Sequence, residues 1–361
     1  MGVRLATPHD REARERFYAS RASARRSGIY VERTPDVFQS FRTEGAETDL
    51  VLAEDSSTRR VTGAGAASYR RAYLNGGPEP IQCGYLGSLE IEPGQWRLLR
   101  AGYAELSARA RTRRCPVHLT SVLSANAHAR KVLPSRRLGI PEYRWEGGLT
   151  TMICSPRALR KLGRGEVSDE VSARVATRAD YGDIDRFITE VGPLWQAFPA
   201  YTCEDLTGRG FLPDACPQKL LVVRDQRQVR AIGLVWDIER MKRWRINLGG
   251  MNPLAKLLRR LGLKLQALPD ILSTTARCSF LAARLVRADD PQALRRLLVE
   301  AGKLMPAGAS LCLTFHERDP LAKVLERIAA IRLSSELFSV HFDQVTFDFD
   351  GRPFYVEAGA L

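Results

Sequence analysis

The most constraining feature of the sequence is a repeat of its opening segment near the middle of the chain. Residues 3–17 return at residues 173–187 without a gap. The identical pairs are Arg4 and Arg174, Ala6 and Ala176, Thr7 and Thr177, Asp10 and Asp180, Arg16 and Arg186, and Phe17 and Phe187. In each copy a short strand pattern runs into Thr-x-x-Asp, whose side-chain oxygens can accept hydrogen bonds from free N–H groups at a helix N-terminus. The repeat predicts two similar units, each opening with a strand, a cap and a helix.

The length of the chain agrees with two units, because 361 residues suit two domains of roughly 100–200 residues each. Residues 155–172 are polar and charged, contain Gly-Arg-Gly, and immediately precede the second copy. Such a segment is typical of a connection between domains. We therefore predict an N-terminal domain at residues 1–154, a linker at 155–172 and a C-terminal domain at 173–361.

The pattern of apolar residues orders the elements in the same way in both units. In the first, strand patterns at 50–53, 61–74 and 81–91 precede a helical pattern at 97–114 and a strand at 117–123. In the second, strands at 220–224, 229–236 and 279–286 precede a helix at 291–304 and a strand at 310–315. Both units therefore have strands in a meander, then a helix, then a further strand.

The repeated Arg-x-Ala-Thr-x-x-Asp opening and this element order resemble the GNAT (Gcn5-related N-acetyltransferase) superfamily. The resemblance implies an α/β (α+β) fold of two tandem GNAT-like domains, each a mixed, mainly antiparallel twisted sheet flanked by helices. It also implies an N-acyltransferase that moves an acyl group, in the usual case acetyl, from acyl-CoA to a small-molecule or peptide amine by direct attack.

In the family, the turn between the fourth strand and the third helix binds the pyrophosphate of CoA, because a helix N-terminus presents free N–H groups and a favourable dipole to an anion. Residues 89–102 have the strand, proline and turn in the matching order. The usual Gln/Arg-x-x-Gly-x-Gly/Ala signature is broken: aligned on Arg97 it has Arg100 at the first glycine position, and aligned on Gln95 it has Leu98 there. The resemblance implies CoA-binding roles for Leu89, Ile91, Pro93, Gly94, Gln95, Trp96, Arg97, Arg100, Gly102 and Asn126.

Catalytic residues follow from the same resemblance. The segment after Asn126 resembles a family helix that carries a tyrosine, which protonates the departing thiolate, but Leu133 stands in its place. Tyr143 or Tyr103 could replace it if the fold brings one within reach. Glu90 is the candidate general base, with Tyr85 near the start of the same strand. Glu90 and Glu92 share a parity that directs both away from the acceptor face unless a bulge shifts the register.

The second unit differs at the corresponding turn, residues 285–294. Asp289 and Asp290 would repel a pyrophosphate there, and the turn has no glycine. We infer that the second unit has lost CoA binding and serves to complete the acceptor pocket.

The net charge of the chain does not identify the acyl donor. The formal net charge of +14 favours an anionic partner, and CoA, an acyl carrier protein and tRNA all qualify. Residues 253–268 read as a basic amphipathic helix of the kind that can meet such partners, or as a core-packed helix with a solvated face. The alternatives to CoA-dependent transfer are transfer from aminoacyl-tRNA or an acyl carrier protein, and a non-catalytic binding protein with this fold.

Metal and membrane functions have no support in the sequence. The seven cysteines include no Cys-x-x-Cys pair, and the five histidines form no ligand pair, so we predict no metal. No apolar run approaches the roughly 18 residues of a membrane-spanning helix, and the N-terminus lacks the apolar core of a signal peptide. These features predict a cytoplasmic protein without a transmembrane segment.

Overall fold

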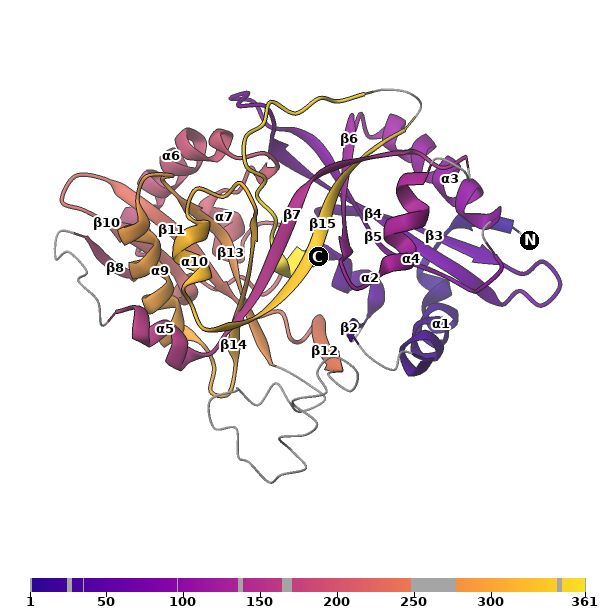
Figure 1. Ribbon diagram of the computed structural model, residues 1–361, viewed down its shortest axis with the longest axis horizontal. Coiled ribbons are helices and arrows are strands. Elements are labelled where there is room, and N and C mark those ends of the chain that lie inside the picture. Colours follow the sequence, from indigo (N-terminus) through magenta and orange to yellow (C-terminus); the bar gives the residue numbers. More distant parts are fainter. Residues whose placement is uncertain are drawn as a thin grey trace.

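A computed structural model describes residues 2–24, 28–34, 36–95, 97–135, 139–163, 171–247, 277–342 and 346–360. Thirteen strands of these residues form one sheet (Figure 1). The first half of the chain contributes β1 (Gly2–Leu5), β3 (Glu47–Glu54), β4 (Val61–Tyr73), β5 (Ile81–Ile91), β6 (Val117–Leu123) and β7 (Glu142–Cys154). The second half contributes β8 (Ser172–Val175), β9 (Phe198–Pro199), β10 (Leu220–Arg224), β11 (Val229–Trp236), β13 (Cys278–Val286), β14 (Ser310–His316) and β15 (Ala330–His341).

The order of strands reads equivalently from both edges. It runs β1-β3-β4-β5-β6-β15-β7-β14-β13-β11-β10-β8, with β9 attached to β4. The pairs β5–β6 and β13–β14 are parallel, and the other pairs are antiparallel. The mixed, mainly antiparallel sheet and the repeated order confirm the predicted fold class.

The two halves exchange strands at the centre of the sheet. β15 of the second half lies between β6 and β7 of the first, and β7 in turn pairs with β14 of the second half. The two halves therefore share one sheet. The domain boundary between residues 154 and 173 stays a prediction, and it concerns only how the chain divides in sequence. The predicted linker begins with helix α5 (Pro156–Leu162), whose buried Leu159 packs against Gly302 in α9 (Pro291–Leu304).

The repeated opening forms the same hydrogen-bonded turn in both halves. Arg4 donates two hydrogen bonds, of 2.8 and 2.6 Å, to Asp10, and Arg174 donates two of 2.6 and 2.7 Å to Asp180. The same aspartates accept from the backbone N–H of the preceding threonine. These bonds, the arginine bonds foremost, lower the pKa of both carboxyls. The identical residues of the repeat thus hold each first strand to the start of α1 (Arg11–Ala24) or α6 (Tyr181–Val191).

Helices cover both faces of the first half. Alternate residues of β3 show this: Val51 packs with Leu99 of α3 (Arg97–Thr112), whereas Leu52 packs with Phe17 of α1. The face of α3 also carries α4 (Ala127–Val132), and the face of α1 carries α2 (Val37–Ser40). A separate two-stranded sheet, β2 (Gly28–Arg33) with β12 (Lys242–Asn247), joins segments of the two halves. α7 (Cys203–Leu206) and α10 (Ala322–Glu326) complete the second half.

Candidate active site

The candidate site begins where β5 and β6 separate. The two strands pair in parallel over Cys83–Tyr85 and Val117–Leu119, and the hydroxyl of Thr120 then donates a 2.8 Å hydrogen bond to the carbonyl of Leu86. Beyond these contacts the strands diverge. We call this opening the splay.

A bulge in β5 lies at the splay. The register with β4 shifts between Ala64 and Ala66, and Ser88 has a positive φ of 54°. As a result, Leu86 and Ile91 pack against the same apolar cluster on the α3 face although they are five residues apart. Glu90 therefore lies on the opposite face, which it shares with Tyr85, and the bulge supplies the register shift that a general base on this strand requires.

The splay opens into a cavity of about 1130 Å³ that is lined from both faces of the sheet. On the α3 face the lining is mainly apolar, and its polar side chains are Thr120, Asn126 and the two tyrosines Tyr103 and Tyr143. The opposite face carries the five charged side chains of the lining: Glu15, Glu32, Arg33, Glu44 and Glu90. Pockets of roughly 300–1000 Å³ with this mixture are typical of small-molecule sites.

Most of the predicted site residues border this cavity. They are Tyr85, Leu89, Glu90, Ile91, Gly102, Asn126 and Tyr143. The remaining predicted residues lie at the N-terminus of α3: Pro93 and Gly94 form an exposed turn, Gln95 follows, and Arg97 and Arg100 are exposed on the first helical turn. Gly94 has a positive φ of 83°, and a Cβ there would meet nothing within 4 Å, so its backbone is accessible. Trp96 lies outside the described residues.

Two predicted residues, and Glu92 on the same strand as Glu90, have positions that the sequence did not indicate. Gly102 lies in the second turn of α3 and faces Val51, not the phosphate turn. Asn126 caps α4 by accepting a 3.1 Å hydrogen bond from the N–H of Ala129. Glu92 leaves the strand and pairs with the exposed Arg60.

A pair of buried tyrosines borders the cavity together with Leu133. The hydroxyls of Tyr103 and Tyr143 lie 2.5 Å apart, both rings are buried, and both residues line the cavity beside Leu133. Burial raises the pKa of Tyr103 to about 12 and, together with the neighbouring tyrosine, raises the pKa of Tyr143 well above 10. Both hydroxyls therefore keep their protons at neutral pH. On the other face, burial raises the pKa of Tyr85 to about 12, and its hydroxyl lies 2.8 Å from that of Ser121.

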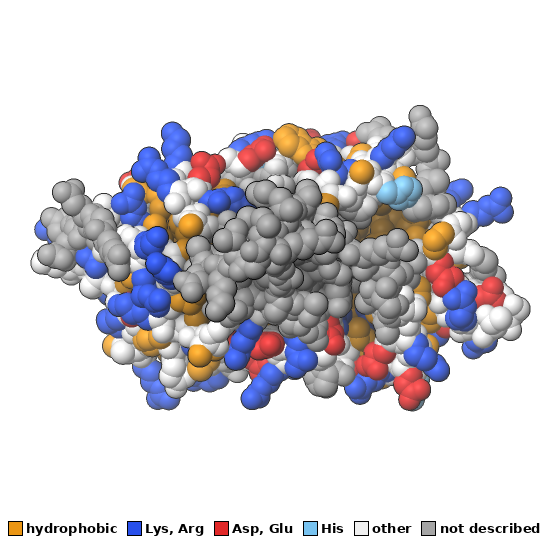
Figure 2. Space-filling view, turned by 60° about the horizontal axis from the view of Figure 1, so that its bottom comes forward, with side chains coloured by type: hydrophobic (Ala, Val, Ile, Leu, Met, Phe, Trp, Pro, Cys, Tyr) orange, Lys and Arg blue, Asp and Glu red, His pale blue; other side chains and the backbone are white. Residues whose placement is uncertain are grey.

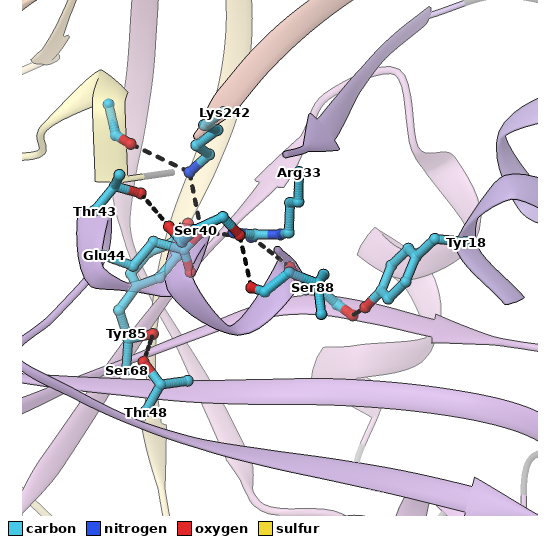
Figure 3. A network of polar contacts seen from close by, with 12 residues as sticks. Tyr18, Arg33, Ser40, Thr43, Glu44, Thr48, Ser68, Tyr85, Ser88 and Lys242 are labelled. Atoms are coloured by element: carbon cyan, nitrogen blue, oxygen red, sulfur yellow. Dashed lines mark hydrogen bonds and ion pairs between the residues drawn. The ribbon is translucent and has the colours of Figure 1, made fainter. Parts of the chain in front are cut away.

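A buried charged cluster on the face opposite α3 was not predicted. Glu44 accepts hydrogen bonds from Arg33 at 2.5 Å and from Lys242 at 3.0 Å, and Arg33 also donates to the hydroxyl of Ser88 at 2.8 Å (Figure 3). Burial lowers the pKa of Lys242 to about 8, whereas the pKa of Glu44 is lowered because the two cations outweigh its burial. The cluster joins the bulge to β2 and β12. Lys242 and Glu44 are far apart in sequence, so no local pattern could reveal the contact.

The second half supplies part of the same cavity. Trp244 of β12 and Leu333 and Ser335 of β15 line it. At the N-terminus of α9, Asp290 accepts a 2.8 Å hydrogen bond from the N–H of Ala293 and pairs with Arg230 at 2.7 Å. A carboxylate of the chain thus caps the N-terminus of α9.

The remaining predictions concern the basic segment, metal binding, membrane-spanning helices and surface charge. The basic segment 253–268 lies outside the described residues. No group of three or more metal-ligating side chains occurs among the residues that the structure describes. Of the helices in the described ranges, none is both long and apolar enough to span a membrane. Figure 2 shows a face on which Lys and Arg side chains are spread over the described surface with Asp and Glu among them, so net charge does not locate a partner there.

Comparison with known proteins supports the fold through structure alone. No protein-family model matches the sequence, and no curated protein matches it. A GCN5-related N-acetyltransferase from Sphaerobacter thermophilus is similar in structure with a TM-score of 0.53 and 12% identity, over 96% of this chain and 98% of that one. The N-myristoyltransferase of Saccharomyces cerevisiae, solved with bound myristoyl-CoA, is similar with a TM-score of 0.51 and 8% identity, over 87% of this chain and 72% of that one.

Identities this low establish shared architecture and leave activity open. The likeness to the Sphaerobacter thermophilus structure extends over nearly the whole chain and so includes the two halves together. The protein therefore has the fold of the GNAT superfamily, as its repeated opening segment predicts.

Proposed function

We propose that the protein is an N-acyltransferase that moves an acyl group from coenzyme A to an amine, with the chemistry in the first half. The observation that carries this proposal is the splay between β5 and β6, which opens into a cavity lined from both faces of the sheet. A donor can enter such a cavity from the α3 face and an acceptor from the other, so that they meet at the bulge.

The donor side has the groups that a nucleotide thioester needs. Backbone N–H groups at the start of α3, the open turn at Gly94, and the exposed Arg97 and Arg100 can receive the phosphates of CoA. Asn126 lies at the cavity wall on α4, where its cap position orients it. The broken glycine signature leaves these backbone donors in place.

The acceptor side provides a base and a wall. Glu90 shares its face with Tyr85, Glu44 and Trp244, and four carboxylates line this side of the cavity against one arginine. A carboxylate-rich lining attracts a protonated amine. In the proposed reaction Glu90 takes the proton of the amine, directly or through water, while Tyr85, held by Ser121, borders the nucleophile.

The transfer balances with the groups present. The amine nitrogen attacks the thioester carbonyl, a carbon–nitrogen bond forms and the carbon–sulfur bond breaks. Backbone N–H groups at the β5 bulge can stabilise the oxyanion. Tyr143, kept protonated by burial, donates its proton to the departing thiolate and regains one from solvent.

Calorimetric titration with acetyl-CoA, octanoyl-CoA and desulfo-CoA tests the donor assignment, followed by assays of CoA release with amine acceptors. We expect saturable binding that Arg97→Glu with Arg100→Glu weakens at least tenfold. Lys323→Glu in the second half is the matched control and should leave the affinity unchanged. Absence of binding at millimolar ligand would contradict CoA as donor and favour a carrier protein or tRNA, whose binding weakens steeply with salt. Binding without turnover would favour the non-catalytic alternative.

A further inference from the structure

Part of the cavity extends away from the splay, beneath helix α3. It crosses the sheet from β5 over β4 and β3 to β1, and we call it the α3 chamber. Its lining on this route comprises Val3, Val51, Ala53, Gly63, Gly65 and Gly102. Three inter-strand spacings separate β5 from β1, which corresponds to roughly 14 Å. A donor that delivered only an acetyl group at the splay would leave this space unused.

The chamber exists because the chain places glycine on both of its walls. Gly63 and Gly65 lie on the same side of β4 as Ala67, which packs in the α3-face cluster, so the strand presents little side-chain volume to the helix. On the helix, Gly102 faces the strands. A Cβ on Gly65 would come no closer than 3.6 Å to Leu89, and one on Gly102 no closer than 4.0 Å to Val51. Neither Cβ would clash, so steric necessity does not require glycine at either position.

The walls of the chamber suit an alkyl chain. The five charged side chains of the cavity belong to its opposite face, and none of the six residues that line the chamber has a polar side chain. The polar side chains on the α3 face of the whole cavity are those of Tyr103, Thr120, Asn126 and Tyr143. Protein interiors are close-packed, and an unfilled apolar void lowers stability in proportion to its volume. An apolar ligand that fills the void recovers those contacts.

We propose that the α3 chamber holds the alkyl chain of the acyl donor, so that the donor is a medium- or long-chain acyl thioester and not acetyl-CoA. This inference rests on the proposed acyl transfer, since it assigns the thioester carbonyl to the splay. Leu86 and Ile91, which border both the splay and the α3 face, would guide the chain from one to the other.

A chain-length series tests the proposal. Affinities for acetyl-, butyryl-, hexanoyl- and octanoyl-CoA are measured by calorimetry on the full chain. Affinity should rise about fourfold per added methylene, which is the roughly 0.8 kcal/mol of each buried methylene converted at 1.4 kcal/mol per tenfold. Equal affinities across the series would overturn the proposal while leaving acyl transfer intact.

Filling the chamber provides the second arm. Gly102→Leu should lower octanoyl-CoA affinity at least tenfold and leave acetyl-CoA affinity unchanged, and Gly65→Leu should act in the same direction. Leucine has a higher helix propensity than glycine, so Gly102→Leu should not destabilise α3. A loss of octanoyl-CoA affinity in this variant could then not be attributed to unfolding. Ala104→Leu, at an exposed position of the same helix, is the matched control. An equal loss in Ala104→Leu would contradict the assignment.

A third probe separates this inference from the proposed function. If no acyl-CoA of any length binds, the CoA-dependent function fails, and octanoate alone is then titrated. Octanoate binding that Gly102→Leu removes would retain the chamber as an alkyl site for a donor other than CoA. No octanoate binding would overturn the chamber assignment as well.

Discussion

Strands β5 and β6 in the first half correspond to β13 and β14 in the second, and the two pairs share their local structure but differ in the groups that border the opening between the strands. Each pair is parallel over three residue pairs and then separates. Each outer strand carries a bulge with a left-handed residue, Ser88 with φ 54° or Ala283 with φ 49°. In the first half the bulge borders the cavity. In the second half the C-terminal segment of the chain covers it.

The covering segment satisfies the bulge of β13 with its own polar groups. Glu357 accepts a 2.8 Å hydrogen bond from the N–H of Ala283, and the hydroxyl of Tyr355 accepts one of 3.2 Å from the N–H of Arg284. Glu357 also accepts from the hydroxyl of Tyr201. The bulge that borders the cavity in one half is thus covered by the C-terminal segment in the other. The two halves share the backbone of this region, and the side chains packed against it determine which half has a cavity there.

The largest expected effect concerns the exchanged strands. A fragment of residues 1–163 lacks β15, which lies between β6 and β7, so we expect it not to fold on its own. Circular dichroism and urea titration of the fragment measure this. In the full chain, unfolding followed by tryptophan fluorescence and by circular dichroism should give coincident transitions. A fragment with a cooperative transition would show that the halves are independent after all.

Removal of the Glu357 carboxylate, which covers the bulge of β13, should lower the stability of the protein nearly as much. Glu357→Ala leaves buried donors without an acceptor and Arg70 without its partner at 3.5 Å, and we expect a loss of about 3 kcal/mol in the free energy of unfolding. Chemical denaturation measures the change. Asp348→Ala, at a largely exposed carboxylate, should change stability by less than about 0.5 kcal/mol. Equal stability of Glu357→Ala and the parent would mean that the second splay does not need its cover.

Substitutions at the splay between β5 and β6 should change turnover and not folding. Tyr143→Phe removes the proton donor and should lower kcat at least about 100-fold with little change in acyl-CoA affinity. Tyr181→Phe in the second half, outside the cavity, should leave kcat unchanged. Because burial raises the pKa of Tyr143 well above 10, activity should not decline through its ionisation between pH 7 and 9. A kcat within threefold of the parent would remove Tyr143 from the proposed mechanism.

A smaller effect is expected at the N-termini of α3 and α9, the helices that follow the two bulges. Asp290→Ala removes the cap of α9 and the partner of Arg230, so we expect about 1–2 kcal/mol lower stability and no change in acyl-CoA affinity. Thermal denaturation and calorimetry give the two readouts. A change in acyl-CoA affinity would indicate that the second half takes part in donor binding.

The repeated turns should show the smallest difference. Asp10→Asn and Asp180→Asn should each cost about 1 kcal/mol at pH 7, with the larger effect at Asp180, which is more buried and also pairs with Arg224. Both carboxyls have a lowered pKa in the folded protein, so their contribution is fully present above the unfolded value of about 4 and is lost progressively as the pH falls from there through the lower folded pKa. Denaturation at pH 7 and pH 3 should show the gap between parent and variant narrowing. A gap that stays constant would exclude an ionic origin.

The sequence by itself determined the features that depend on short stretches of chain. The capped opening could be read from Arg4, Thr7 and Asp10 and their second copy, because the hydrogen bonds join residues within one turn. The strand–turn–helix around Pro93 could be read in the same way, and it led to several of the residues that border the cavity, including Leu89, Glu90 and Ile91. The acidic turn at Asp290 also follows from local sequence.

Only the tertiary structure decided the remaining features. Gly87 precedes the bulge at Ser88, but only the observed register shows that the bulge moves Glu90 to the face of Tyr85. The contact of Lys242 with Glu44, the exchange of β7 with β15, and the cover formed by Glu357 each join segments more than 70 residues apart. Local propensity is fixed by neighbours along the chain. Whether a splay stays open or is filled depends on which distant side chains pack into it, and that choice exists only once the chain has folded.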